Sequence, residues 1–147
     1  MVRSIIAVIV SYIAMFVLNL LGFIGLYAVV GPSQAFKPRL YVASNRWFVM
    51  ALAVMIVSGI IAGLICAAIA RGRKATLALA GLILVVGLLL AIPAIMKSRA
   101  NADMVRVGDV PAMEAMEKAS WPVWAPFVFP FVSALGAVIG GKLKKRT

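Results

Sequence analysis

Three prolines at a spacing of four are the residues with the clearest potential for chemistry. They are Pro122, Pro126 and Pro130, in the stretch WPVWAPFVFP. Proline has no backbone N–H, so in a helix the carbonyl four residues earlier loses its hydrogen-bond donor. We therefore expect Pro126 and Pro130 to free the carbonyls of Pro122 and Pro126. Such acceptors are costly in hydrocarbon and must face protein, water or a ligand.

Few polar side chains could meet these carbonyls. At about 1.5 Å of rise per residue, Asn19 falls at their depth, and we expect its amide to donate to the Pro126 carbonyl. The sequence thus predicts one polar layer near the midplane, made by Asn19, Ser58, Ser133, Pro126 and Pro130. The layer has two interpretations. It could hold helices together, at about 0.6 kcal/mol per hydrogen bond, or line a solute path at a broken helix.

Groups that catalyse reactions are scarce. The chain has no His and one Cys, Cys66, which removes imidazole catalysis, the usual zinc and haem sites, and any disulfide or CxxC redox pair. The acids are confined to one loop, and they are Asp103, Asp109, Glu114 and Glu117. Because no nucleophile has a base in reach, we expect no enzyme activity, no cofactor and no metal.

The elements that position these residues are apolar segments. The 147-residue chain is 65% hydrophobic and 13% charged, and a soluble domain of this size has too little interior for so much apolar surface. A membrane span needs roughly 20 apolar residues, and four segments reach that length. They are residues 4–30, 47–70, 75–96 and 121–141. Only helices satisfy the backbone of such segments in lipid.

The expected fold is therefore all-α: a single domain (1–147) forming an integral membrane bundle of four transmembrane helices. The second outer loop, residues 97–120, contains DVPAMEAMEKAS. This stretch predicts a short surface helix capped by Asp109, with Pro111 in its first turn. The first apolar run far exceeds the about 7–15 residues of a signal peptide core, so we expect it to be a retained helix.

Small residues recur at a spacing of four on the second and fourth segments. This spacing lets helix backbones approach closely and gain van der Waals contact. The predicted packing positions are Gly59, Gly63, Ala67, Gly136 and Gly140. Packing within the chain is the first interpretation, and a contact face for a second copy is the alternative.

The net charge of +11 indicates membrane topology and attraction to anionic lipid rather than nucleic-acid binding. The cations expected to contact lipid headgroups are packed near helix ends, and they are Arg71, Arg73, Lys74, Lys142, Lys144, Lys145 and Arg146. The positive-inside rule places these segments, and both termini, in the cytoplasm.

The four apolar spans, the turn ARGRK and the ending GAVIGGKLKKR resemble those of small, uncharacterised bacterial inner-membrane proteins. The resemblance covers the whole chain. It implies a multi-pass protein of the bacterial inner (plasma) membrane, and it implies no activity.

Together these features favour a non-enzymatic membrane protein, either self-associating or an accessory subunit of a larger membrane assembly. The alternative is a small solute carrier or channel that uses the polar layer at the proline-broken fourth helix. A continuous polar cavity reaching the midplane would favour transport, whereas a closely packed interior would favour the structural role.

Overall fold

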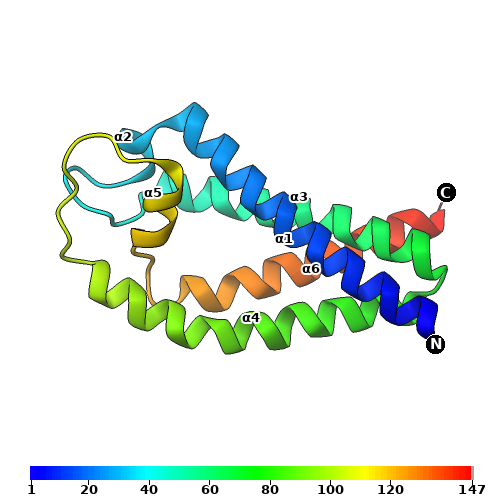
Figure 1. Cartoon of the computed structure of the whole chain (residues 1–147). Coiled ribbons are helices and arrows are strands. Elements are labelled where there is room, and N and C mark those ends of the chain that lie inside the picture. The colour runs from blue at the N-terminus through cyan, green and yellow to red at the C-terminus, as the bar shows by residue number, and fades with distance from the viewer. Residues whose placement is uncertain (147) are drawn as a thin grey trace.

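The chain is helical along most of its length (Figure 1). The computed structural model describes the backbone of residues 1–146 and the side chains of residues 1–144. The helices are α1 (Val2–Val30), α2 (Pro32–Ala35), α3 (Asn45–Ala70), α4 (Arg73–Asn101), α5 (Ala112–Lys118) and α6 (Ala125–Arg146). Residues 1–146 form no strand, only isolated bridges between loop residues. The predicted all-α fold is confirmed, with α5 as the surface helix of the second outer loop.

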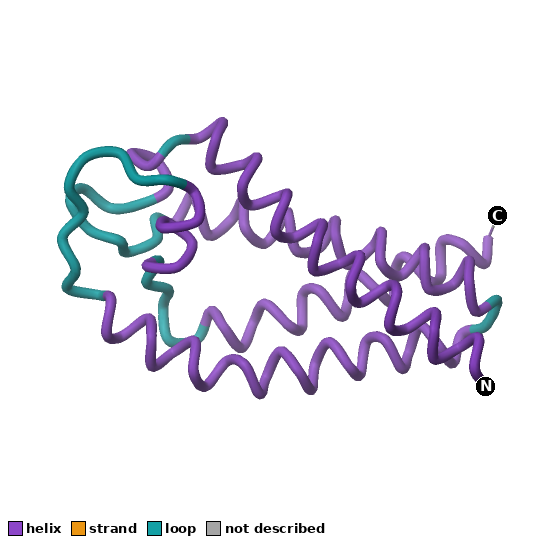
Figure 2. The backbone as a smooth tube through the Cα atoms, in the orientation of Figure 1, coloured by secondary structure: helices purple, strands orange, loops and turns teal. Residues whose placement is uncertain are grey.

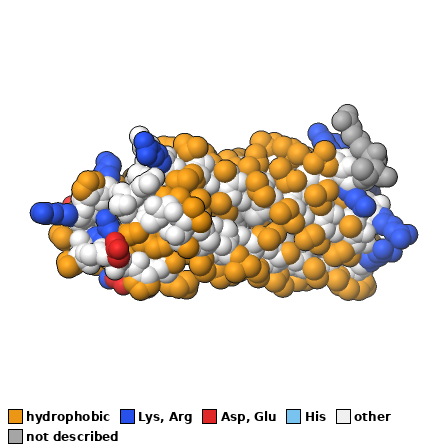
Figure 3. Space-filling view, turned by 90° about the horizontal axis from the view of Figure 1, so that it is seen from above, with side chains coloured by type: hydrophobic (Ala, Val, Ile, Leu, Met, Phe, Trp, Pro, Cys, Tyr) orange, Lys and Arg blue, Asp and Glu red, His pale blue; other side chains and the backbone are white. Residues whose placement is uncertain are grey.

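Four helices, α1, α3, α4 and α6, are long and apolar enough to cross a membrane. Apolar side chains form a band between two ends that carry Lys and Arg (Figure 3). Such a band matches the hydrocarbon core of a bilayer, so the chain is a multi-pass membrane protein. Both termini and the α3–α4 turn lie at one end of the bundle, the terminal end. The longer loops gather at the other, the loop end (Figure 2).

The helices pack around a core of small side chains. α6 lies against both α3 and α4, and α1 lies against α3. Fully buried residues include Ala7, Ala62 and Ala137, one from each of three spans. Because alanines hold neighbouring backbones close, the core depends on shape complementarity more than on large side chains.

Two helix boundaries differ clearly from the predicted ones. α4 runs to Asn101 rather than ending near residue 96. Ser98, in its last turns, is buried and donates a hydrogen bond to the Trp121 carbonyl, which holds this end of the helix in place. α6 begins at Ala125 rather than near residue 121. The reason is a turn over residues 121–124, in which the Ala125 N–H donates to the Pro122 carbonyl at 2.9 Å.

The surface helix α5 begins at Ala112, after an N-cap at Pro111 that makes no side-chain hydrogen bond. The prediction that Asp109 caps this helix is therefore wrong. Packing holds α5 in place instead, because Ala115 is buried in a cluster with Tyr27 and Trp47. α5 thus closes the loop end of the bundle.

Candidate functional site

Of the predicted polar layer, the structure brings together Asn19 of α1 and Ser58 of α3. The Ser58 hydroxyl lies 2.8 Å from Asn19 Oδ1, to which it donates, and 3.0 Å from the Met55 carbonyl. The hydrogen bonds of the described side chains do not include the expected one from Asn19 to the Pro126 carbonyl. Asn19 instead ties α1 to α3, which is the behaviour of an interhelical contact.

The proline series gives one break in α6, not two. Pro126 lies in the first turn, where a missing donor costs little, and the Pro122 carbonyl accepts from Ala125. The prediction that Pro126 frees the Pro122 carbonyl is therefore wrong. Pro130 does lie inside α6. Its buried ring packs on Gly87 of α4, where an added Cβ would overlap the ring.

The glycine ridges join α3 to α6 within the chain. A Cβ on Gly63 would overlap the Ala137 carbonyl, and one on Gly140 would overlap the Ile60 carbonyl. The predicted residues in this seam are Gly59, Gly63, Ser133, Gly136 and Gly140. Ala67, predicted to continue the ridge, is half-buried and lines a cleft at the terminal end. The α3 and α6 backbones therefore meet over much of the bundle's length.

An apolar cavity of about 240 Å³, here called the outer cavity, lies between the helices near the loop end. Its aromatic lining comprises Phe23, Tyr27, Phe36, Trp47, Trp121 and Phe129. Met55 and Met116 add flexible thioether side chains that adapt to a ligand's shape. Ala94 of α4 lines the cavity and is also exposed on the flank of the bundle. A cavity with these walls suits an apolar ligand that comes from the bilayer.

Ring packing fixes the shape of the outer cavity. Tyr27 and Trp47 meet edge to face, with centroids 6.1 Å apart and planes at 82°. Elsewhere in the lining, the rings of Trp121 and Phe129 meet edge to face, with centroids 5.2 Å apart and planes at 89°. Because edge-to-face pairs are favourable beyond their buried area, these walls are preformed.

The two outer loops join above the cavity through backbone hydrogen bonds. Ala43 donates to the Ser120 carbonyl at 2.9 Å, and Ser120 donates to the Tyr41 carbonyl at 2.8 Å. Further out, Arg106 donates to the Arg39 carbonyl at 2.9 Å. We call the joined segments, residues 36–44 and 102–124, the loop cap. These bonds hold the cap as an ordered cover rather than two independent loops.

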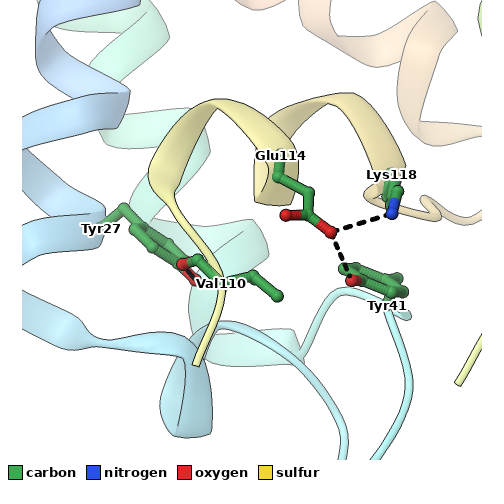
Figure 4. Close-up of polar contacts among 5 residues, drawn as sticks. All are labelled: Tyr27, Tyr41, Val110, Glu114 and Lys118. Carbon is green, nitrogen blue, oxygen red and sulfur yellow. Dashed lines mark hydrogen bonds and ion pairs between the residues drawn. The ribbon is translucent and has the colours of Figure 1, made fainter. Parts of the chain in front are cut away.

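Side chains fasten the loop cap to the helices. The Tyr27 hydroxyl donates to the Val110 carbonyl at 2.8 Å. Glu114 accepts from Lys118 at 2.8 Å and from the Tyr41 hydroxyl at 3.2 Å (Figure 4). The hydrogen bond from Lys118 lowers the pKa of the Glu114 carboxyl, and the same bond raises the pKa of Lys118. Tyr41 thereby links the first outer loop to α5.

A second cavity, here called the basic cleft, lies at the terminal end and has a volume of about 680 Å³. The ends of α3 and α6, the α3–α4 turn and the start of α4 line it. Four of the predicted headgroup cations lie on its walls, and they are Arg71, Arg73, Lys142 and Lys144. Lys74 is exposed and is not part of the lining. The side chains of Lys145 and Arg146, also predicted to contact headgroups, lie outside the described residues.

Two buried hydroxyls lie inside the terminal half of the bundle. Ser11 of α1 and Thr76 of α4 flank the Cys66 thiol of α3, a weak hydrogen-bonding group. Neither hydroxyl has a hydrogen-bond partner of ordinary geometry. Of the three residues, Thr76 lines the basic cleft. No group of three or more His, Cys, Asp or Glu among residues 1–144 is placed to hold a metal ion.

Sequence reasoning missed both cavities. The convergence of the aromatic residues that line the outer cavity depends on contacts between segments that are distant in the sequence. No family model, curated protein or solved structure matches the chain. The chemistry of the two cavities therefore follows from their own residues, which are aromatic at the loop end and cationic at the terminal end.

Proposed function

We propose that this chain is a non-enzymatic membrane protein that holds a lipid hydrocarbon chain in its outer cavity, as an accessory component of a membrane assembly. The observation that carries this proposal is the aromatic cavity that reaches the flank of α4 at Ala94. Apolar ligands favour concave, aromatic-lined sites of this kind. The bilayer is the nearest source of such a ligand.

Access from the membrane, rather than from water, is supported by the loop cap. Backbone bonds between Ala43, Ser120 and Tyr41 close the aqueous side of the cavity. Ala94, in contrast, lies in a span and presents only a methyl group at the cavity's rim. A hydrocarbon chain that enters beside Ala94 would leave its polar headgroup at the membrane surface.

The alternative function, a carrier or channel, has weaker support. Asn19 and Ser58 are hydrogen-bonded to each other, and the seam at Gly63 brings two backbones together. A solute path would need polar groups that are free to exchange partners along the bundle. Self-association through the glycine ridges is also disfavoured, because α3 and α6 use those ridges for each other.

The proposal extends to location. The density of Lys and Arg at the terminal end supports cytoplasmic termini in a bacterial inner membrane. The acids lie in residues 103–117, at the opposite end of the bundle.

Photochemical labelling tests the proposal. The purified chain is irradiated with a diazirine-bearing fatty acid, and the labelled residues are mapped by mass spectrometry. We expect labelling at Met55 and Met116, and we expect it to fall about fivefold or more in Ala94→Phe, because the larger side chain fills the entrance. Ala78→Phe, an exposed site on the same helix, is the matched control and should label like the parent chain.

Two results would overturn the proposal. One is labelling spread over the outward-facing side chains with none in the cavity. The other is an equal effect of Ala94→Phe and Ala78→Phe on the yield.

A further inference from the structure

We propose that the basic cleft at the terminal end binds a phosphate ester, the group shared by anionic phospholipid headgroups and soluble organic phosphates. This site is independent of the outer cavity, which lies at the opposite end of the bundle. Its volume of about 680 Å³ leaves room for a phosphate together with the glycerol unit that carries it. Three separate observations point to an anion there.

The first observation is charge. Arg71 and Arg73 come from the α3–α4 turn, and Lys142 comes from the last turns of α6. Arg71 adopts a left-handed conformation, with φ of 52°, as the C-cap of α3, and this tight turn sets both arginines beside the same cleft. The ion pairs Lys97–Glu117 and Lys118–Glu114 lie at the loop end and involve none of these three cations. Among residues 1–144, whose side chains the structure describes, no Asp or Glu lines the cleft.

The second observation is the start of α4, a helix of 29 residues. Its N-cap, Gly72, has no side chain to bond the first backbone N–H groups, and its first turn contains no acid. Gly72 and Arg73 both line the cleft. Unbonded N–H groups and the positive end of the helix dipole favour an anion at this position.

The third observation is Thr76. It is only 4% exposed, it lines the cleft, and its hydroxyl has no hydrogen-bond partner of ordinary geometry. The Cys66 thiol beside it is only a weak hydrogen-bonding group, so a ligand oxygen that reached the Thr76 hydroxyl would be a stronger acceptor. Thr76 packs directly on Gly141, where an added Cβ would overlap it. The lack of a side chain at Gly141 therefore lets α6 lie directly against Thr76 at the edge of the cleft.

The walls of the cleft also match the body of a lipid. Leu77 and Val138 line it together with Ala68, and these residues belong to the spans. A phosphate at Arg73 and Thr76 would place its glycerol unit near these apolar side chains. A soluble phosphate ester would use the same cations and hydroxyl but not the apolar wall.

Binding measurements on the purified full chain in neutral detergent test this site. In one arm, phosphatidylglycerol is titrated and bound lipid is counted by native mass spectrometry, with phosphatidylcholine as the comparison lipid. In the other arm, glycerol 3-phosphate is titrated and its binding is measured by calorimetry. Preference for phosphatidylglycerol alone identifies a lipid headgroup as the ligand, whereas comparable binding of glycerol 3-phosphate identifies a soluble phosphate ester.

Three variants localise the binding. Arg73→Gln should weaken it about tenfold, because a charge-assisted hydrogen bond is lost. Thr76→Val has a similar volume, replaces the hydroxyl with a methyl group, and should weaken binding about threefold or more. Lys74→Gln makes the same change of charge one residue away, outside the cleft, and should alter binding less than about twofold.

Circular dichroism and thermal unfolding show whether each variant is folded, and the comparison is made among folded variants. The proposal is overturned if neither phosphate compound binds. It is also overturned if Lys74→Gln weakens binding as much as Arg73→Gln. The phosphate compound would then be attracted by the overall positive charge of the terminal end rather than bound in the cleft. Binding that is unchanged in both Arg73→Gln and Thr76→Val would contradict it too.

Discussion

The hydroxyl of Ser98 bridges the backbone of Trp121. It accepts from the Trp121 N–H at 2.6 Å and donates to the Trp121 carbonyl at 2.8 Å. Ser120 adds a hydrogen bond to the Ser98 carbonyl at 2.9 Å. This junction joins the end of α4 to the loop cap at Trp121, the first residue of the turn that precedes α6. A wall of the outer cavity therefore depends on one buried serine.

Ser98→Ala should lower the free energy of unfolding by about 1–3 kcal/mol, because it leaves partly buried backbone groups of Trp121 without the Ser98 hydroxyl. Denaturant titration in detergent, followed by helix signal, measures the loss. Ser4→Ala, the same change at an exposed site in α1, is the control and should shift stability by less than about 0.5 kcal/mol. Equal stability of the two variants would mean that the junction is dispensable.

Gly63→Ala should destabilise the chain by about 1–3 kcal/mol or more, because the new methyl group meets the Ala137 carbonyl. Gly81→Ala is the matched control, since nothing lies within 4 Å of a Cβ at that position of α4. That variant should be neutral or stabilised by about 0.5–1 kcal/mol through helix propensity. The same unfolding titration compares the two variants. If Gly63→Ala is as stable as the parent chain, the α3 and α6 backbones do not meet at Gly63.

The contacts of Glu114 predict how the loop cap responds to pH. The pKa of Glu114 is lowered by its hydrogen bond from Lys118, so the stabilisation is present above the ordinary glutamate pKa, about 4.3. It is lost as the pH falls through the lower pKa of the folded state. The pKa of Lys118 is raised, so the same contact is present below the ordinary lysine pKa, about 10.4, and is lost as the pH rises through the higher folded value.

Hydrogen exchange of residues 112–118, corrected for the intrinsic effect of pH, measures this window. Protection of α5 should be level across the neutral range and should fall at both extremes. Glu114→Gln should lower protection at neutral pH and flatten the profile. Glu117→Gln is the control and should retain the parent profile, because the ion pair of Glu117 with Lys97 is exposed and spans 3.8 Å.

Topology gives a fourth prediction. A fluorescent protein that folds only in the cytoplasm should be active when fused after α6, whereas a phosphatase that needs an oxidising compartment should be inactive there. Both termini lie at the terminal end (Figure 1), so an N-terminal fusion should behave in the same way. Opposite results at the two termini would contradict four membrane crossings.

Much of the helical framework could be predicted from the sequence because hydrophobic length determines where spans lie. The glycine seam could be anticipated as well, since Gly59 and Gly63 share one face of α3. The start of α6 could not, because the turn at Pro122 competes with the helix that the apolar run favours. The loop cap could not be predicted either, because its backbone hydrogen bonds join residues such as Ala43 and Ser120, which no periodic pattern in the sequence relates.

The candidate sites were less accessible to sequence reasoning than the fold. Asn19 was recognised as a polar group in a span, but its partner proved to be Ser58 rather than a proline-freed carbonyl. The cations of the basic cleft were seen as separate clusters at helix ends. Only the packing of α6 beside the α3–α4 turn brings Lys142 to the same cleft as Arg73.

Quenching of Trp47 by brominated lipid chains tests the central claim most directly. Trp47 is only 3% exposed and lines the outer cavity, and Trp121→Phe with Trp124→Phe leaves it as the sole tryptophan. In bilayers of lipids brominated on their chains, we predict strong quenching of Trp47 that Ala94→Phe largely removes and Ala78→Phe leaves intact. If the single-tryptophan protein and its Ala94→Phe and Ala78→Phe variants are all quenched equally, the result would contradict a hydrocarbon chain in the outer cavity.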